Sequence, residues 1–383
     1  MEGKFSFGIG CFHFGVKKIP PFKFEGSEYI NKLRTTLQSI SNIDNISIYC
    51  DEEFENSSTD VTEELPNISK GVGLFPKPLF MDIEFQLYIP YRIQAQLLEQ
   101  TGLKQEIEFL ETFTEKFKVS IHYTYDLPVA FVEPINPSQK GTSSEAVIIV
   151  RKFLIHEFES SKSDYIQFEW LGPSPFHADC YIQSGETPGD NERNWEFEVK
   201  RLSQRGYDTI IFYFNPIIFA KAEEAKEAII EEIQDELGFF YSLEQIEVEK
   251  MYDWEEIQDS VDQLISIQRE KGIKGFLKKM FTCSKHINEA FISIAEFESN
   301  ELFHRNIILR HYRNIYSDKK ETYFQFYVNK KIKDRFTYPT KQGVELISLF
   351  ESRRIKSVEI FVVLISAMIG GGIGALLTIF LSK

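Results

Sequence analysis

Apolar and polar residues alternate with a period of two along several short stretches of the first 215 residues. The clearest stretch runs from Asp82 to Ile89, where Asp, Glu, Gln and Tyr alternate with four large apolar residues. Successive side chains of a strand point to opposite faces of a sheet, so this pattern predicts a strand with one wet face. The same pattern predicts strands at residues 5–14, 46–50, 119–125, 165–170, 178–183, 195–202 and 209–214.

Helical periodicity interleaves with these strands. Apolar residues recur every three to four positions at residues 28–40, 93–117 and 146–158, which predicts helices there. Several strands also follow one another directly, and such pairs favour antiparallel neighbours over a doubly wound parallel sheet. We therefore predict an α+β fold, in which a mixed sheet with interleaved helices precedes a mainly helical region and one C-terminal transmembrane helix.

The helical region begins after Pro216. Ala222, Ala225 and Ile229 trace one face of a helix that Gly238 is expected to end. Further helices are predicted at residues 254–270 and 285–316, a strand at 323–328, and a last helix from residue 341 onward. The predicted division is an α+β domain at 1–215, a helical region with a basic neck at 216–340, and a juxtamembrane and transmembrane segment at 341–383.

The last apolar stretch is the strongest single signal in the sequence. Residues 360–381 hold no charged residue. At about 1.5 Å per residue they would form a helix of about 33 Å, close to the roughly 30 Å hydrocarbon core of a bilayer. The pattern predicts a tail-anchored, single-pass membrane protein.

Charge around this stretch predicts an orientation and a lipid partner. Residues 301–357 contain 13 Lys and Arg against six Asp and Glu, whereas the whole chain carries a net charge of −15. Basic flanking residues favour the cytoplasmic side, which places the N-terminal domain in the cytoplasm. An anionic leaflet is the expected partner of the neck, and the acidic head makes nucleic acid an unfavourable one. The basic residues predicted to face the membrane are Lys330, Lys331, Lys333, Arg335, Arg353, Arg354 and Lys356.

Small residues repeat within the apolar stretch. Small side chains four positions apart let helix backbones approach closely, so the repeat predicts a homo-oligomer formed through this helix. The residues concerned are Ser366, Ala367, Gly370, Gly371, Gly374 and Ala375.

Composition limits the remaining possibilities. Hydrophobic residues make up 43% of the chain, which is too many for a disordered protein. The four cysteines are dispersed, as expected for free thiols rather than for a disulfide framework. No phosphate-binding glycine loop is present, and no motif indicates a cofactor.

One weak motif suggests an enzyme. In PD-(D/E)xK nucleases, carboxylates on neighbouring strands bind Mg²⁺ and a lysine supports the attacking water. Asp179 falls on one predicted strand, and Glu198 and Lys200 fall on the next one. The chain between this strand and the following one is too short for the helix that such a nuclease needs, and an amphipathic strand explains the same residues.

A second weak pattern suggests a metal. His177 and Cys180, and likewise Cys283 and His286, are three positions apart and could each supply two ligands to zinc. No CxxC pair supports the site, and such spacings arise often by chance.

These observations together favour a membrane-tethered sensor, scaffold or effector over an enzyme. The cytoplasmic domain would recognise a protein or a small molecule. By analogy of architecture alone, bacterial antiviral effectors that disturb membranes are organised in this way. A membrane-anchored nuclease using Asp179, Glu198 and Lys200 is the alternative.

Overall fold

The structure is a computed structural model of the whole chain, and it divides into two compact units. The α+β unit comprises Met1–Ile246 and His311–Asp334, and the helical unit comprises Glu247–Arg310 and Arg335–Lys383. The described residues are 5–63, 65, 68, 75–76, 80–99, 114–124, 127–136, 142–160, 164–172, 179–185, 196–204, 207–317 and 322–381, without the side chains of 98–99, 203–204, 207 and 372–381.

An eight-stranded mixed sheet forms the centre of the α+β unit, in the order β11-β12-β10-β1-β8-β7-β6-β4. β10 and β12 pair in parallel, and the other neighbours pair antiparallel. Two small sheets, β2-β9 and β3-β5, complete the unit. The strands are β1 (Phe5–Gly10), β2 (Phe12–Val16), β3 (Phe22–Glu25), β4 (Ile43–Cys50), β5 (Ser58–Val61), β6 (Met81–Tyr88), β7 (Lys116–Thr124), β8 (Leu127–Pro134), β9 (Ile166–Trp170), β10 (Asp179–Ser184), β11 (Phe197–Gln204) and β12 (Tyr207–Phe214).

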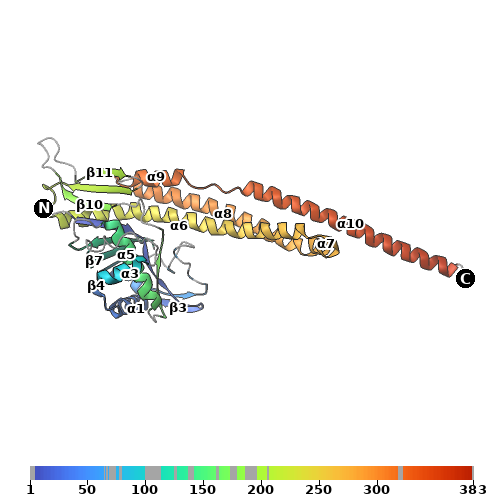
Figure 1. Cartoon of the computed structure of the whole chain (residues 1–383), viewed down its shortest axis with the longest axis horizontal. Coiled ribbons are helices and arrows are strands. Elements are labelled where there is room, and N and C mark those ends of the chain that lie inside the picture. The colour runs from blue at the N-terminus through green and yellow to red at the C-terminus, as the bar shows by residue number, and fades with distance from the viewer. Residues whose placement is uncertain are drawn as a thin grey trace. The chain divides into compact units, whose positions relative to one another are not determined.

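Helices cover both faces of the large sheet (Figure 1). α5 packs on β1 and β8. The two layers approach closely at Gly8, because a Cβ added there would lie 2.2 Å from the carbonyl oxygen of Ser143. On the opposite face, a Cβ added at Gly238 of α6 would lie 3.8 Å from Val129 of β8. The helices that begin in this unit are α1 (Gly26–Ser39), α2 (Glu52–Glu55), α3 (Tyr91–Glu99), α5 (Ser143–Ser160), α6 (Ala222–Arg269) and α9 (Gln325–Lys333).

The α+β fold with a large mixed sheet agrees with the prediction, but several elements differ from it. The stretch predicted as one strand at residues 5–14 is two strands, β1 and β2, which belong to different sheets. The predicted strand at 323–328 lies mostly in the helix α9. α6 is 48 residues long and passes through Gly238 without a break, so the predicted helix end at this glycine is wrong.

The helical unit is built from the second half of α6, α7 (Gly272–Phe281), α8 (Cys283–Tyr316) and α10 (Thr340–Leu381). α6 ends at a tight corner, where Gly272 adopts a φ of +79° that a residue with a side chain rarely adopts. Apolar residues from α6, α8 and α10 form one core, which consists of Ile257, Leu264, Ile267, Cys283, Ile287, Ala290, Ile294, Phe297, Ile347 and Phe350.

The structure corrects the prediction of a membrane anchor. Among the residues that the structure describes, no helix is long and apolar enough to cross a bilayer. The first half of α10 is charged, and of the predicted span only residues 360–371 have described side chains. The remaining residues of that span lie outside the described side chains.

Other predictions depended on the same span and are corrected with it. They are the single-pass, tail-anchored topology, the cytoplasmic placement of the head, the membrane location and the comparison with membrane-disturbing effectors. The lipid partner of the basic neck is not tested by this finding and stays a prediction.

Candidate functional site

Polar side chains line one half of the sheet face that α6 covers. The alternation in β6 and β7 turns Asp82 and Glu84 to the same face as Ser120 and His122. The register then sets them side by side, because Asp82 pairs with His122 and Glu84 pairs with Ser120. Directly opposite side chains of an antiparallel pair are close enough to interact.

Asp82 and His122 form the shortest of these cross-strand contacts. The Nδ1 atom of His122 lies 2.7 Å from an Oδ1 oxygen of Asp82. An ionised carboxylate can only accept, so Nδ1 carries the hydrogen and Nε2 is left as an acceptor in the neutral ring. The ring of His122 also packs edge-on against Phe131, with centroids 5.6 Å apart. These contacts fix the orientation of the imidazole.

Further polar contacts extend along the same two strands. Lys118 Nζ lies 3.2 Å from a carboxylate oxygen of Glu84, and Ser120 Oγ donates to the other oxygen at 3.3 Å. Glu84 therefore already holds a lysine and a hydroxyl.

α6 covers one side of this polar surface. Lys226 Nζ lies 2.8 Å from Glu133 on β8 and 4.9 Å from the ring centroid of Phe5 on β1. Both side chains of this ion pair are largely buried, which holds the helix against the sheet. The next turns of α6 carry Glu227 and Glu231 along the same edge.

Two adjoining cavities lie between α6 and the polar half of the sheet. Their volumes are about 290 and 400 Å³, and they share Asp82, His122 and Gln234. We call the smaller cavity and its lining the sheet-face cleft. The cleft is lined by Phe7, Asp82, Glu84, Lys118, Ser120, His122, Phe131, Glu133, Lys226, Glu227, Ile230, Glu231 and Gln234.

Negative charge dominates the cleft. It contains five carboxylates and two lysines, and each lysine already contacts one carboxylate. Asp82, Glu227 and Glu231 therefore have no lysine or arginine partner among the described residues. Like charges four positions apart on a helix, such as Glu227 and Glu231, repel each other unless a cation lies nearby.

The cleft offers hydrogen-bond acceptors but no activated nucleophile. The hydroxyl of Ser120 donates to Glu84. In the adjoining cavity, burial raises the pKa of Cys50 to about 11, so this thiol is protonated at neutral pH. No group of three His, Cys, Asp or Glu among the described residues is arranged to hold a metal ion.

The residues predicted for a nuclease lie in one sheet but on strands that are not neighbours. β12 lies between β10, which carries Asp179, and β11, which carries Glu198 and Lys200. Two strand spacings amount to about 9.6 Å, much more than Mg²⁺ ligands allow. Asp179 instead accepts hydrogen bonds at the start of α5, from Ser144 N at 2.8 Å and Ser143 Oγ at 3.1 Å.

The residues predicted as zinc ligands are not brought together within either unit. His177 lies outside the described residues. Cys180 is fully buried in β10, where burial raises the pKa of the thiol. Cys283 accepts a hydrogen bond from Gln268 in the helical unit, where His286 contacts Glu289 at 3.1 Å.

The basic residues predicted at a membrane surface have other contacts or positions. Lys331 pairs with Glu244 at 2.8 Å, and Arg335 pairs with Glu247 at 2.9 Å. Lys330 and Lys333 lie on α9, whereas Arg353, Arg354 and Lys356 lie on α10.

The predicted small-residue repeat has only partly described side chains. Ser366, Ala367, Gly370 and Gly371 are described, and a Cβ added at either glycine would meet nothing within 4 Å. The side chains at Gly374 and Ala375 lie outside the described part.

The sheet-face cleft was not predicted from the sequence. Its signal was present, since polar residues occupy alternate positions in both the 82–89 and the 119–125 predicted strands. What the sequence lacked was the register that sets Asp82 opposite His122.

Comparison of the chain with known protein families, with curated proteins and with solved structures finds no match. Function is therefore inferred from the geometry of the chain's own residues.

Proposed function

We propose that the α+β unit binds a small organic cation, such as an amine or a guanidinium compound, in the sheet-face cleft. One observation carries the proposal. Asp82, Glu227 and Glu231 line one cavity with no lysine or arginine partner among the described residues, beside a histidine that Asp82 orients.

The lining fits the chemistry of such a ligand. A carboxylate forms charge-assisted hydrogen bonds to an ammonium or guanidinium group, and these are about twice as strong as neutral ones. The free Nε2 atom of His122 offers one further acceptor. A cation bound there would also remove the repulsion between Glu227 and Glu231.

The size of the cavity limits the ligand. A volume of about 290 Å³ lies at the lower end of the range for small-molecule sites. A short diamine or agmatine is therefore a better match than a peptide.

Thermal unfolding and calorimetric titration with putrescine, agmatine and succinate test this proposal. The two cations should raise the unfolding temperature, whereas succinate, which carries the opposite charge, should not. Asp82→Asn and Glu231→Gln should each weaken cation binding about 5- to 10-fold, since each removes one charge-assisted contact.

Glu223→Gln is the matched control, because Glu223 is an exposed residue of the same helix outside the cleft. Equal stabilisation by succinate would contradict the proposal. Unchanged cation binding by both cleft variants would contradict it as well.

A further inference from the structure

We propose that the helical unit forms a two-fold dimer, in which α7 of each chain docks into the groove between α6 and α10 of a second copy. This proposal concerns the helical unit and does not depend on the ligand of the α+β unit.

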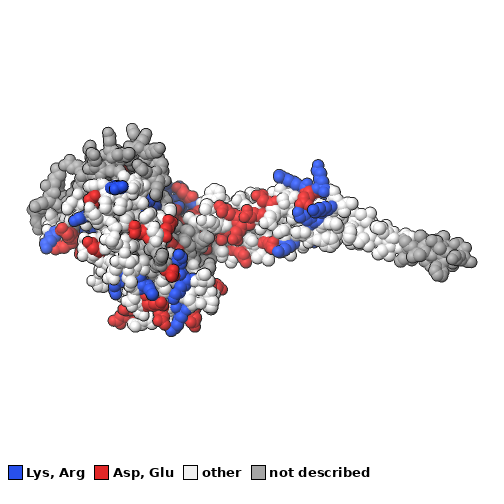
Figure 2. Space-filling view, turned by 60° about the horizontal axis from the view of Figure 1, so that its bottom comes forward, with Lys and Arg blue, Asp and Glu red and all other residues white. Residues whose placement is uncertain are grey.

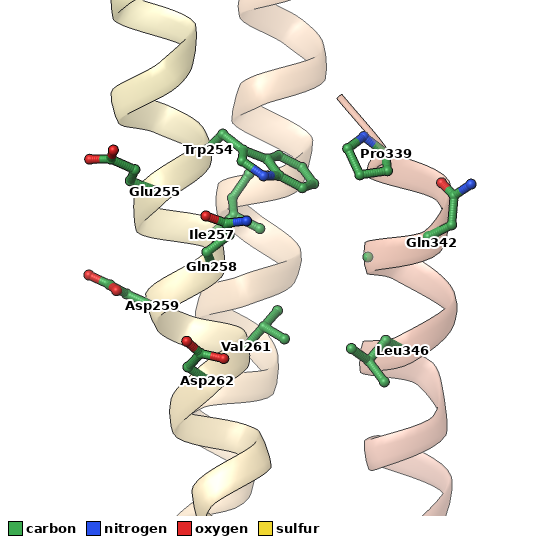
Figure 3. Close-up of a pocket in the computed structure, with 11 residues that line it drawn as sticks. Trp254, Glu255, Ile257, Gln258, Asp259, Val261, Asp262, Pro339, Gln342 and Leu346 are labelled. Atoms are coloured by element: carbon green, nitrogen blue, oxygen red, sulfur yellow. The ribbon is translucent and has the colours of Figure 1, made fainter. Parts of the chain in front are cut away.

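The groove is an open cavity of about 520 Å³ in the helical unit. Trp254, Val261 and Leu346 give it an apolar lining, and Figure 3 shows Trp254 and Val261 pointing from α6 toward α10. A cavity of this kind between two helices suits the apolar side of a third helix.

One edge of the groove is acidic. Glu255, Asp259 and Asp262 are spaced four and three positions apart on α6, so they form a ridge along it. In Figure 3, Glu255 and Asp259 point away from α10, beyond the apolar lining. None of the three has an ion-pair partner within the described part of the chain. The groove therefore combines an apolar floor with an edge that attracts cations.

α7 has the complementary surface. Ile273, Leu277 and Phe281 recur every four positions and are 83%, 40% and 68% exposed, which leaves an apolar stripe in solvent. Lys274 and Lys279 carry charge on the same short helix, which contains no acidic residue. An exposed stripe of this size marks an interaction surface.

The two surfaces also match in length. Trp254 to Asp262 and Ile273 to Phe281 each cover eight helical steps, or about 12 Å. On the face seen in Figure 2, acidic side chains gather over one part of the helical unit and basic side chains over a separate part of it. A chain that carries both surfaces can satisfy both at once in a two-fold dimer, because such an interface repeats each contact.

Sedimentation velocity of the full chain tests the proposal, in a mild non-ionic detergent because the described residues Ile360 to Ile369 are largely exposed. The wild type should be a dimer at about 50 μM in low salt. Its dissociation constant should rise at 500 mM salt, since charges at an exposed rim are screened.

Two charge-reversal variants identify the contact. Asp259→Lys/Asp262→Lys places lysines opposite the lysines of α7, and Lys274→Glu/Lys279→Glu places carboxylates opposite the acidic ridge. Each variant alone should dimerise at least tenfold more weakly than the wild type.

An equimolar mixture of the two variants should recover a heterodimer with an affinity near that of the wild type. One of its contacts has both charges reversed, and the other has both unchanged. Recovery also shows that both variants are folded.

Glu296→Lys/Glu298→Lys is the control, because these exposed residues of α8 lie outside the groove lining. It should dimerise like the wild type. A monomeric wild type would overturn the proposal, and so would reversal variants that dimerise normally or fail to recover when mixed. Binding of α7 to the groove of an unrelated protein instead of a second copy would appear as a monomeric wild type.

Discussion

Glu236 of the α+β unit and Lys250 of the helical unit are both charged residues with almost no exposed surface, yet different groups hold them. The carboxylate of Glu236 accepts hydrogen bonds from the backbone N–H of Tyr323 at 2.8 Å and of Phe324 at 3.0 Å. The hydroxyl of Tyr316 donates a third bond at 3.0 Å. Neutral donors, two of them from the main chain, therefore stabilise this charge.

The helical unit relies on charged side chains instead. Lys250 forms an ion pair with Glu301 and lies 4.0 Å from Glu247. Arg335 contacts the same two carboxylates, at 2.9 Å for Glu247 and 3.6 Å for Glu301. The four residues form one network of two cations and two anions.

The difference follows from the backbone. Lys250 is a cation and needs acceptors, but inside a helix every C=O already accepts from the N–H four residues later, so packed helices have few free backbone acceptors for it. Irregular segments and helix starts, such as the approach to α9, leave N–H groups free. A buried lysine between packed helices therefore needs acidic side chains.

Removing Glu236 should have the largest effect. Glu236→Ala leaves two buried backbone donors and a half-buried hydroxyl without an acceptor, and it should lower the free energy of unfolding of the α+β unit by about 4 kcal/mol. Urea unfolding followed by circular dichroism measures this change. Glu236→Gln keeps one acceptor oxygen and should lose less. Glu223→Ala is the exposed control, and a loss similar to that of the control would show that the backbone donors contribute little.

Lys250→Met should destabilise the helical unit by about 3 kcal/mol, because it leaves carboxylates beside a buried methionine. Adding Glu301→Gln should recover part of that loss, since the two residues interact directly. Lys285→Met, at a 76% exposed side chain, should change the stability by less than about 0.5 kcal/mol. If Lys250→Met cost no more than this control, the network would not stabilise the unit.

His13 should make the α+β unit sensitive to acid. Burial lowers its pKa to about 3, whereas an unfolded histidine titrates near 6.5. Between these values the unfolded chain binds a proton that the folded chain does not, so stability falls as the pH falls, by up to about 1.4 kcal/mol per pH unit.

Urea unfolding at pH 6.5 and 4.5 should show the wild type losing about 2.3 kcal/mol more than His13→Phe, because the unfolded histidine is already half protonated at pH 6.5. Glu169 lies opposite His13 in the β2-β9 ladder, and burial raises its pKa, which contributes a change of the opposite sign. Because Glu169 is present in both chains, the difference isolates His13. Equal losses in the two proteins would contradict the buried, neutral state of this histidine.

Asp179→Ala should have the smallest effect, about 1 kcal/mol, the usual cost of losing a side-chain acceptor at a helix start. Asp179→Asn keeps an acceptor and should stay within about 0.5 kcal/mol of the wild type. Urea unfolding of the two variants measures both values. A loss equal in both would contradict the capping role of Asp179.

Strands with one wet face could be predicted from the sequence, and fully covered strands could not. Residues 82–89 alternate cleanly, and the strand β6 (Met81–Tyr88) covers nearly all of them. β8 has the sequence LPVAFVEP and is buried on nearly all positions, so it offers no alternation, and no strand was predicted there. Residues 323–328 were predicted as a strand from a period of two, but most of them lie in α9, whose start is fixed by Glu236, far away in the sequence.

The candidate site was harder to predict than the strands, because it depends on pairing between distant segments. Each polar residue of β6 and β7 could be assigned to a wet face, but the opposition of Asp82 and His122 depends on the register of two strands 40 residues apart. The covering helix comes from a third segment, and its Glu227 and Glu231 could not be placed beside that pair from periodicity alone.

The discontinuous path of the chain has a consequence for the order of events on the ribosome. The backbone donors for Glu236 lie 87 and 88 positions later in the chain, and most of the helical unit is encoded between them. At about 5–20 residues per second, roughly 4–17 s of translation separate the carboxylate from these donors. The hydrogen bonds of Glu236 in the α+β unit therefore form only after residues 247–310 of the helical unit have been synthesised.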